Sequence, residues 1–255
     1  LTASTRGLGE AIITALEAGA RRLTLALGGS ASTDGGFGAL SALGLRLLDA
    51  DSRPLPDGGG ALEHLAAINP VLLRAAPPGG TTLLPDTAAV FAPQKGASAE
   101  QVAALESGLA RAAAIVGGDE HLRPGSGAAG GTAWGFAWYW GASIRSGADV
   151  IAVLTGLDAA LEGADLVITG EGHFDATSRA GKVVGGVAER ASAADVPLAI
   201  VAGHADADAT ADAEAAGLGH LLTLSALAGS SAAAVAEPER WLRAAATALA
   251  REQMP

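Results

Sequence analysis

The stretch Asp165-Leu-Val-Ile-Thr-Gly-Glu-Gly-His-Phe-Asp175 decides the fold of the C-terminal part of this chain. Its apolar beginning predicts a strand over residues 165–169, and the glycines that follow predict a loop. Helical spacing returns over 180–194, and another apolar run predicts a strand over 197–202. Strands that alternate with helices are typical of a parallel sheet, so we expect a doubly wound C-terminal portion.

The alternation extends in both directions from this stretch. Beyond it we expect a helix over about 208–216, a strand over 219–223 and a closing helix over 238–251. Before it we expect helices over 7–18 and 37–44, a strand over 22–27 and an extended pair near 45–55. Ser98, with Gln101 three residues later, resembles a capping sequence and predicts a helix from Ser98 to about Val116. Trp134, Trp138 and Tyr139 fall at helical spacing, so we expect them to pack in the interior, with Phe136 and Trp140 on flanking faces. The chain therefore reads as α/β with two domains, residues 1–163 and 164–255.

A second glycine-rich stretch, Gly28-Gly-Ser-Ala-Ser-Thr-Asp-Gly-Gly36, follows the strand expected at 22–27. Glycine allows positive φ and close approach of the backbone, so that successive N–H groups can converge on anionic oxygens. We expect the two loops to contact a phosphorylated ligand through Gly28, Gly29, Ser30, Gly170, Glu171 and Gly172. The carboxylates Asp34, Glu171 and Asp175 are candidates to hold a hydrated Mg²⁺ beside it.

Only two of the sixteen basic residues are lysines, Lys95 and Lys182, and each lies next to a glycine. Because lysine acts on phosphate as a movable point charge, both are candidates to contact the ligand. The alternative is chance, since the chain has 36 glycines. The common nucleotide motifs are excluded: Ala176 stands where a Walker loop needs glycine, Val183 follows Lys182, and Asp175 breaks the dinucleotide fingerprint.

Composition limits the function further. A net charge of -11 argues against general binding to nucleic acid or to an anionic membrane. The absence of cysteine excludes disulfides and thiolate chemistry and is compatible with a cytoplasmic location. The five histidines show no metal-ligand spacing, and the uncharged run from Pro124 to Ile144 is too interrupted to predict a membrane span. Because the chain begins with Leu1, we expect that an upstream segment has been removed or left out.

Four blocks together carry a family resemblance: Gly28-Gly-Ser-Ala-Ser-Thr-Asp-Gly-Gly36, Phe91-Ala-Pro-Gln-Lys-Gly-Ala97, Pro124-Gly-Ser-Gly-Ala-Ala-Gly-Gly131 and Thr169-Gly-Glu-Gly-His-Phe-Asp175. In order and separation they resemble the class I glycerate kinase family over essentially residues 1–255. The resemblance implies a two-domain glycerate kinase-like α/β fold, in which residues 1–163 are most of the central domain and 164–255 the C-terminal part of a split Rossmann-like domain.

The resemblance also implies a function, ATP-dependent phosphorylation of glycerate with Mg²⁺. Asp34 or Asp175 would orient or deprotonate the glycerate hydroxyl, with Glu171 and the other aspartate holding the metal. Lys182 and Lys95 would stabilise phosphate or the substrate carboxylate. The chain departs from the family's pattern in three places: it lacks an upstream strand and Asp-Ser-Phe-Lys-Gly loop, it lacks a recognisable strand and polar segment within 70–88, and it has His173 where arginine is frequent.

Each assignment has an alternative. Asp34 is a good cap for the helix that follows it, Asp175 can close an Asx-turn, and Lys95 can bridge loops. His204 is expected to pack at a strand end. The chain can also be a nucleotide- or metabolite-binding relative without turnover, or a Mg²⁺-dependent enzyme for another hydroxy acid. Oligomeric state stays open, a homo-oligomer included.

Overall fold

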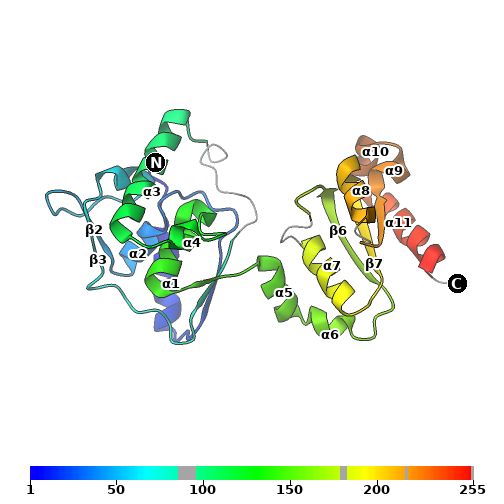
Figure 1. The fold of residues 1–255 in the computed structure, drawn as a ribbon, viewed down its shortest axis with the longest axis horizontal. Helices are drawn as coiled ribbons and strands as arrows, with labels where there is room; N and C mark the ends of the chain where they lie inside the picture. Colours follow the sequence, from blue (N-terminus) through cyan, green and yellow to red (C-terminus); the bar gives the residue numbers. More distant parts are fainter. Residues whose placement is uncertain (86–95, 179–182, 216–217, 254–255) are drawn as a thin grey trace. The chain divides into compact units, whose positions relative to one another are not determined.

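The computed structural model describes residues 1–85, 96–178, 183–215 and 218–253. Its Cα positions divide the chain into two compact units, Leu1–Gly147 and Ala148–Pro255 (Figure 1). This division falls earlier in the chain than the boundary expected at residue 163, because two short helices that precede that residue belong to the second unit. The correspondence of the units to the domains of a family stays a prediction.

The first unit contains a small parallel sheet, several helices and a separate two-stranded ribbon (Figure 1). Its helices are α1 (Arg6–Glu17), α2 (Phe37–Ala42), η1 (Gly59–His64), α3 (Ala99–Val116), η3 (Glu120–Leu122) and α4 (Ala128–Trp140). Its strands are β1 (Leu23–Ala26), β2 (Arg46–Leu48), β3 (Ala67–Asn69), β4 (Thr81–Leu84) and β5 (Ser143–Ile144). The sheet order is β1-β4-β5, all parallel, and β2 pairs antiparallel with β3.

Strand β4 corrects one expectation. The segment 70–88 showed no recognisable strand, yet Thr81–Leu84 forms the middle strand of the sheet, and Leu83 is fully buried. The four residues of β4 follow Pro77, Pro78 and two glycines, and so short a run has too little periodicity to be identified as a strand from sequence. In the structure, hydrogen bonds to β1 on one side and β5 on the other hold them in the sheet.

The extended pair expected near 45–55 is partly correct. Asp49 N–H donates to Arg53 O and Leu55 N–H donates to Leu47 O, so the chain does turn back as expected. The strand that completes the ribbon, however, is β3 from further along the chain.

Helix α3 confirms its predicted start. The Ser98 hydroxyl accepts from Gln101 N–H, and the Gln101 side chain accepts from Ser98 N–H, which completes a capping box. Two backbone donors that the helix leaves unpaired are thereby satisfied.

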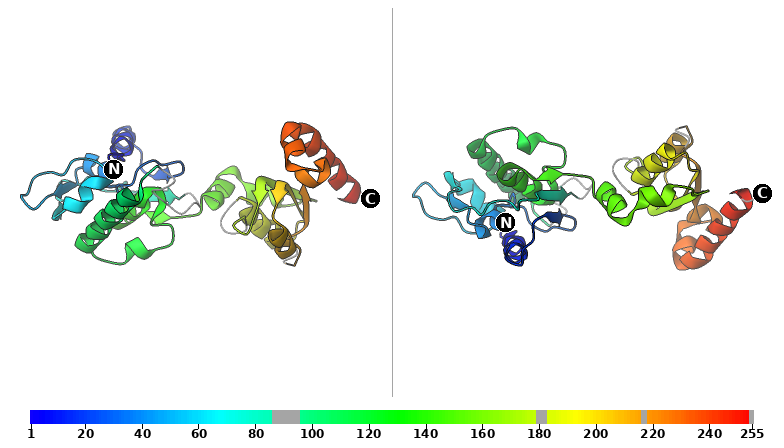
Figure 2. Two further views of the ribbon diagram at one scale, coloured as in Figure 1. Left: turned by 90° about the horizontal axis from the view of Figure 1, so that it is seen from above. Right: turned by 90° about the horizontal axis from the view of Figure 1, so that it is seen from below.

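The second unit is a three-layer α/β arrangement (Figures 1 and 2). Its strands β6 (Val167–Phe174), β7 (Leu198–Ala205) and β8 (His220–Thr223) form a parallel sheet in the order β6-β7-β8. Its helices are α5 (Gly147–Thr155), α6 (Leu157–Leu161), α7 (Val183–Ala193), α8 (Ala207–Ala215), α9 (Leu224–Ala228), α10 (Ser231–Ala236) and α11 (Pro238–Gln253). Neighbouring residues of a strand point to opposite faces. Ile200 packs in a cluster with α7 and α8, whereas Val201 packs beside α9, α10 and α11, so the two sets of helices cover opposite faces.

Strand β6 corrects a second expectation, because it continues through residues 170–174, where the glycines predicted a loop. Gly170 pairs with Val201 of β7, and a Cβ atom on Gly170 would lie 2.3 Å from the Val201 carbonyl oxygen. A Cβ atom on Gly203 would likewise lie 2.5 Å from the Gly172 carbonyl oxygen. Here glycine permits close approach of two strands and does not end one.

Arg190 links α7 to the two helices at the start of the second unit. Its guanidinium lies 2.9 Å from Asp149 of α5 and 3.0 Å from Asp158 of α6. Only 18% of the Arg190 side chain is exposed, so the three groups form a partly buried ionic cluster.

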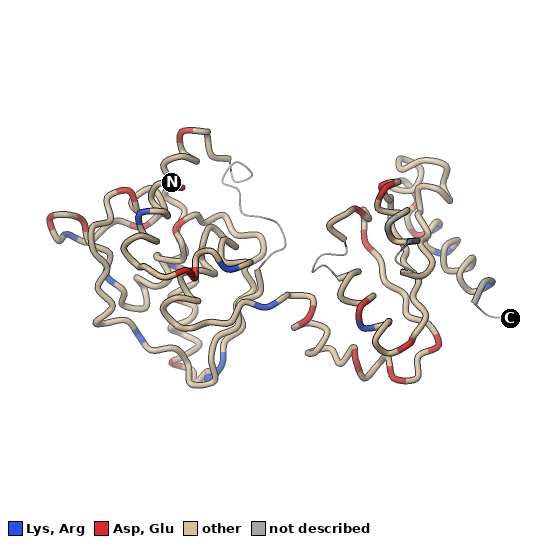
Figure 3. The backbone as a smooth tube through the Cα atoms, viewed as in Figure 1, with Lys and Arg blue, Asp and Glu red and all other residues tan. Residues whose placement is uncertain are grey.

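Figure 3 shows acidic and basic residues scattered along both units. In the part of the chain that the structure describes, the helices are too short or too polar to cross a bilayer.

Candidate functional site

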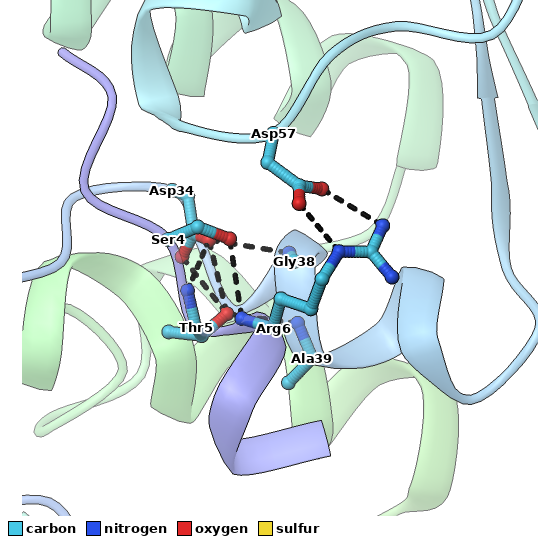
Figure 4. A network of polar contacts seen from close by, with 7 residues as sticks. All are labelled: Ser4, Thr5, Arg6, Asp34, Gly38, Ala39 and Asp57. Carbon is cyan, nitrogen blue, oxygen red and sulfur yellow. Dashed lines mark hydrogen bonds and ion pairs between the residues drawn. The ribbon is translucent and has the colours of Figure 1, made fainter. Parts of the chain in front are cut away.

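The carboxylate of Asp34 is the centre of a buried network in the first unit (Figure 4). Its Oδ2 accepts from the backbone N–H of Thr5 at 2.8 Å, and the Thr5 hydroxyl lies 3.0 and 3.1 Å from its two oxygens. Backbone N–H groups at the start of α2, those of Gly36 and Gly38, donate to Oδ1 and Oδ2 at 3.1 and 3.2 Å. With 1% of the residue exposed, the Asp34 oxygens are supplied with donors by the chain itself.

The Thr5 hydroxyl extends this network into α2, since it accepts from Ala39 N–H at 2.9 Å while it faces Asp34. Glycine is required beside it, because a Cβ atom on Gly38 would lie 2.2 Å from the Ser4 hydroxyl oxygen and 2.7 Å from Asp34 Oδ2. The arrangement joins the segment before α1 to the start of α2. It agrees with the helix-start alternative for Asp34, and a direct catalytic or metal-binding role for this residue stays a prediction.

Arg6 and Asp57 form an ion pair next to this network (Figure 4). Arg6 Nε donates to Asp57, and Arg6 Nη2 donates to the other carboxylate oxygen at 2.9 Å. The hydrogen bonds that Arg6 donates to Asp57 raise the pKa of Arg6, with burial acting in the opposite direction.

The beginning of the first glycine loop is exposed. Gly28 and Gly29 form a turn in which Gly29 has a φ of 68°, a left-handed conformation that glycine adopts without strain. The Ser30 and Ser32 hydroxyls lie 2.7 Å apart. Of the three predicted contact residues, Gly28 and Gly29 are exposed and Ser30 is half-buried, whereas Asp34 is buried.

A second glycine-rich block comes to lie against this loop. Ala129, Gly130 and Gly131 have consecutive left-handed φ values of 54°, 66° and 86° before the regular part of α4 begins. Gly35 N–H donates to Gly130 O at 2.8 Å, and a Cβ atom on Gly130 would lie 2.3 Å from Ser32 O. The structure therefore brings the blocks 28–36 and 124–131 together. A left-handed alanine such as Ala129 is unusual, and strained positions of this kind gather at functional sites.

An apolar pocket of about 280 Å³ adjoins the second block, between α3, η3 and α4. Trp134 lines it but is 4% exposed, with its ring edge-on to Phe37 at a centroid distance of 5.6 Å. The expectation that Trp134 packs in the interior is confirmed. Phe136, expected on a flanking face of the helix, is fully buried. The prediction for Phe136 was wrong, because α4 is apolar on all sides and its sequence does not indicate which face is buried.

In the second unit, Glu171 has a buried carboxylate oxygen, Oε1, without a hydrogen-bond partner among the described residues. Gly170, Glu171 and Gly172 line a pocket of about 550 Å³ together with residues of β7, α9 and α11. A buried carboxylate oxygen without a donor costs free energy, which a cation or a donor on a ligand would offset. Glu171 therefore fits a metal or ligand contact.

Asp175 follows β6 and closes an Asx-turn. Its Oδ1 accepts from Thr177 N–H at 2.7 Å and from the Thr177 hydroxyl at 2.6 Å, while its own N–H donates to the buried Ser178 hydroxyl at 2.9 Å. The turn confirms the structural alternative for this residue and holds the carboxylate in one orientation. It leaves the catalytic and metal-binding roles of Asp175 as predictions. Lys95 and Lys182 lie outside the described residues.

Sequence spacing missed one group of potential ligands. His173, His204 and Asp206 each offer one ligand atom, and these atoms lie within 4.8 Å of one another. The expected packing role of His204 does not match its exposed position. The register of β6 and β7 brings the two histidines together, and the spacing of histidines along the sequence does not reveal that register.

Comparisons with known proteins agree with these motifs. A sequence model described as the glycerate kinase family matches residues 1–254. A protein of Bacillus subtilis named glycerate kinase is 38% identical over 233 residues, 83% of this chain and 59% of its own length. A protein of Escherichia coli named glycerate 2-kinase is 36% identical over 218 residues, 80% of this chain and 57% of its own length. An uncharacterized protein of Synechocystis is 45% identical over 214 residues, 79% of this chain and 57% of its own length.

A solved structure agrees as well. The crystal structure of a Salmonella typhimurium LT2 protein with the provisional name glycerate kinase 2 is 32% identical and has a TM-score of 0.69. The match covers 98% of this chain and 70% of that protein. The chain spans less than two thirds of the length of the curated relatives quoted above. With a family match over residues 1–254 and a mixed α/β fold like that of the Salmonella protein, this chain belongs to the glycerate kinase family.

Proposed function

We propose that this chain takes part in the ATP-dependent phosphorylation of D-glycerate to a phosphoglycerate, in the cytoplasm and with Mg²⁺. The observation that carries the proposal is the buried, unpartnered Oε1 of Glu171 between two glycines that line a pocket of about 550 Å³. Family membership supports the use of ATP and glycerate.

The location of Glu171 suits a phosphorylated ligand. Ligands of open parallel sheets bind beyond the carboxyl ends of the strands, and residues 170–174 form that end of β6. Gly170 and Gly172 remove side chains that would otherwise cover the backbone there. A phosphate with its cation can therefore approach both the strand backbone and the Glu171 carboxylate.

Phosphoryl transfer is catalysed mainly by positioning and by neutralisation of charge. Glu171 and Asp175 would hold Mg²⁺, which when bound neutralises charge on the phosphoryl group that is transferred. Asp175, with Oδ1 fixed by Thr177, would orient the glycerate hydroxyl. Lys182 and Lys95 are assigned to phosphate or substrate carboxylate on the basis of sequence alone.

In the first unit, we assign Gly28, Gly29 and Ser30 to ligand contact, because the two glycines are exposed and Ser30 is half-buried, whereas residues 32–36 of the loop are buried. Asp34 is assigned a positioning role, since its oxygens receive hydrogen bonds from Thr5, Gly36 and Gly38. A loop held from beneath in this way keeps its N–H groups in place before the ligand arrives, which lowers the ordering cost of binding.

The direct test is glycerate-dependent ADP formation by the 255-residue chain with ATP and Mg²⁺, with glycerol and lactate as control substrates. The Glu171→Gln variant should lose activity by about 100- to 1000-fold, the usual cost of one well-placed charge. Glu162→Gln is the matched control, because Glu162 is an exposed carboxylate in the same unit. Activity that is equal with lactate would reject glycerate as the specific substrate.

The alternative is a nucleotide- or metabolite-binding relative without turnover. The observation that favours it is Asp34, a predicted catalytic carboxylate that is 1% exposed and surrounded by donors of the chain itself. Isothermal titration separates the two functions. Binding of ATP or glycerate without glycerate-dependent ADP formation would support the alternative, and a folded chain that binds neither ATP nor glycerate would reject both.

A further inference from the structure

Two imidazole rings occupy matching positions on neighbouring parallel strands of the second unit. His173 of β6 pairs with His204 of β7 in the strand register, and their ring centroids lie 5.4 Å apart. Paired residues of parallel strands project from the same face of the sheet. Both rings therefore leave the sheet on the same side, near the carboxyl ends of β6 and β7.

A carboxylate joins the two rings from the segment that follows β7. Asp206 N–H donates to Phe174 O at 3.0 Å, which holds this segment beside the end of β6. Asp206 Oδ1 lies 2.8 Å from His173 Nε2. With about half of each of these two side chains exposed, an ion in solution can reach the group.

The second imidazole is oriented by a neighbouring hydroxyl. His204 Nδ1 lies 3.2 Å from the Ser225 hydroxyl oxygen, so the other ring nitrogen, Nε2, is the one available as a ligand. Histidines that bind metals usually make such a hydrogen bond through their second ring nitrogen, which fixes the tautomer and the direction of the ring.

The donor set selects a class of metal. Two imidazole nitrogens and one carboxylate oxygen suit Zn²⁺ and other divalent first-row transition ions, whereas Mg²⁺ prefers oxygen ligands alone. Metal-ligand distances of about 2.0–2.2 Å place neighbouring ligand atoms roughly 3 Å apart. The 2.8 Å between His173 Nε2 and Asp206 Oδ1 is close to that spacing.

We propose that His173, His204 and Asp206 bind a divalent transition-metal ion of the Zn²⁺ class, with Ser225 as the positioning residue for His204. Three protein ligands leave a coordination position for water or a small ligand. The site uses residues other than Glu171 and Asp175, and its occupation requires neither ATP nor glycerate. It can therefore be tested whether or not the chain is a kinase.

The experiment is titration calorimetry of ZnCl₂ into the metal-free 255-residue chain. We expect one Zn²⁺ to bind per chain. In a separate titration, we expect that any Mg²⁺ that binds is not displaced by Zn²⁺, because Mg²⁺ should not occupy this site. Co²⁺ should bind to the same residues and give visible absorption bands that Zn²⁺ abolishes. His204→Ala should weaken Zn²⁺ binding by about 100-fold and Ser225→Ala by about 10-fold, in line with the loss of a ligand and of its hydrogen-bond partner.

Two further variants make the result decisive. Asp206→Asn keeps a hydrogen-bonding group of the same size beside His173 while it removes the charge, and it too should weaken binding by about 10-fold or more. His64→Ala is the control, because His64 is an exposed histidine of the first unit, and Zn²⁺ should bind this variant as it binds the parent chain. Circular dichroism verifies that each variant is folded. Absence of stoichiometric Zn²⁺ binding, or equal binding by the parent chain, His204→Ala and Asp206→Asn, would overturn the proposal and leave His173 and Asp206 as a hydrogen-bonded pair.

Discussion

Thr5 contacts the carboxylate of Asp34 twice, through its backbone N–H at 2.8 Å and through its hydroxyl at 3.0 Å. The two residues are 29 positions apart in sequence, and both are at least 93% buried. The pair couples the start of α1 to the start of α2. The first glycine loop therefore owes its shape to a residue outside the loop.

The first prediction concerns this pair. Asp34→Asn replaces an oxygen that receives donors by an amide NH₂, which would face the N–H groups of Thr5 or Gly36. We expect the free energy of unfolding to fall by about 3 kcal/mol, as measured by urea denaturation. Asp51→Asn is the control, because the Asp51 carboxylate is 67% exposed in its ion pair and should contribute less than about 1 kcal/mol. Equal stability of both variants would contradict the structural role of Asp34.

The second prediction tests the contact between the two glycine-rich blocks. A methyl group at Gly130 would lie 2.3 Å from Ser32 O, and its φ of 66° is unfavourable for alanine. We expect Gly130→Ala to lower the free energy of unfolding by about 3 kcal/mol. Gly127→Ala is the matched control, since Gly127 has a φ of -68° and no atom within 4 Å of the added methyl group. That variant should be neutral or more stable by about 0.5 kcal/mol. Similar losses in both would show that the blocks do not touch.

The third prediction uses the unpartnered oxygen of Glu171. In EDTA, Glu171→Gln should raise the free energy of unfolding by about 1 kcal/mol, because an amide costs less than a carboxylate to bury without a hydrogen-bond partner. With Mg²⁺ and ATP the order should reverse, since a ligand at 100 times its Kd stabilises the parent chain by about 2.7 kcal/mol. Thermal denaturation with and without ligand measures both effects. A variant that gains as much from Mg²⁺ and ATP as the parent chain would remove Glu171 from the ligand site.

The fourth prediction is a pH dependence. Tyr139 is the one tyrosine of the chain, its Oη is buried without a partner among the described residues, and burial raises its pKa above the ordinary value near 10. A raised pKa in the folded state favours the neutral phenol. The folded protein therefore keeps its full stability below about pH 10 and loses stability as pH rises beyond that value.

Absorbance at 295 nm tests this dependence on one residue. Tyrosinate should appear in the folded protein at a higher pH than in urea, and together with unfolding. Tyr139→Phe should lack the signal without loss of stability at pH 7, because a buried hydroxyl without a partner adds nothing there. Titration at the same pH in folded and unfolded protein would refute the burial of Oη.

The sequence predicted the elements whose signals are local. The capping box of Ser98 and Gln101 identified the start of α3 to the residue, and the parallel order of the second unit followed from alternating strands and helices. These features depend on neighbours in sequence or on the period of the chain. The overall α/β class was accessible for the same reason.

What the sequence missed depends on contacts across the fold. Gly170 was predicted as a loop residue because its close contact with Val201 of the neighbouring strand cannot be seen in the sequence. Strand β4 was not predicted because it is defined by its pairing with β1 and β5. His173 and His204 become neighbours through strand register. The sequence identified Asp34 as a candidate site residue. It did not predict that Thr5 donates hydrogen bonds to the Asp34 carboxylate and that this carboxylate is buried.

The ionic cluster of Arg190 bears on how the second half of the protein can be studied in isolation. A recombinant fragment that starts at residue 164 would discard Asp149 and Asp158, and a guanidinium with 18% exposure would lose both of its carboxylate partners. A fragment that starts at Gly147, the first residue of α5, keeps them. An expressed fragment of the second unit should therefore include all of α5, so that Asp149 and Asp158 are present to pair with Arg190 of α7.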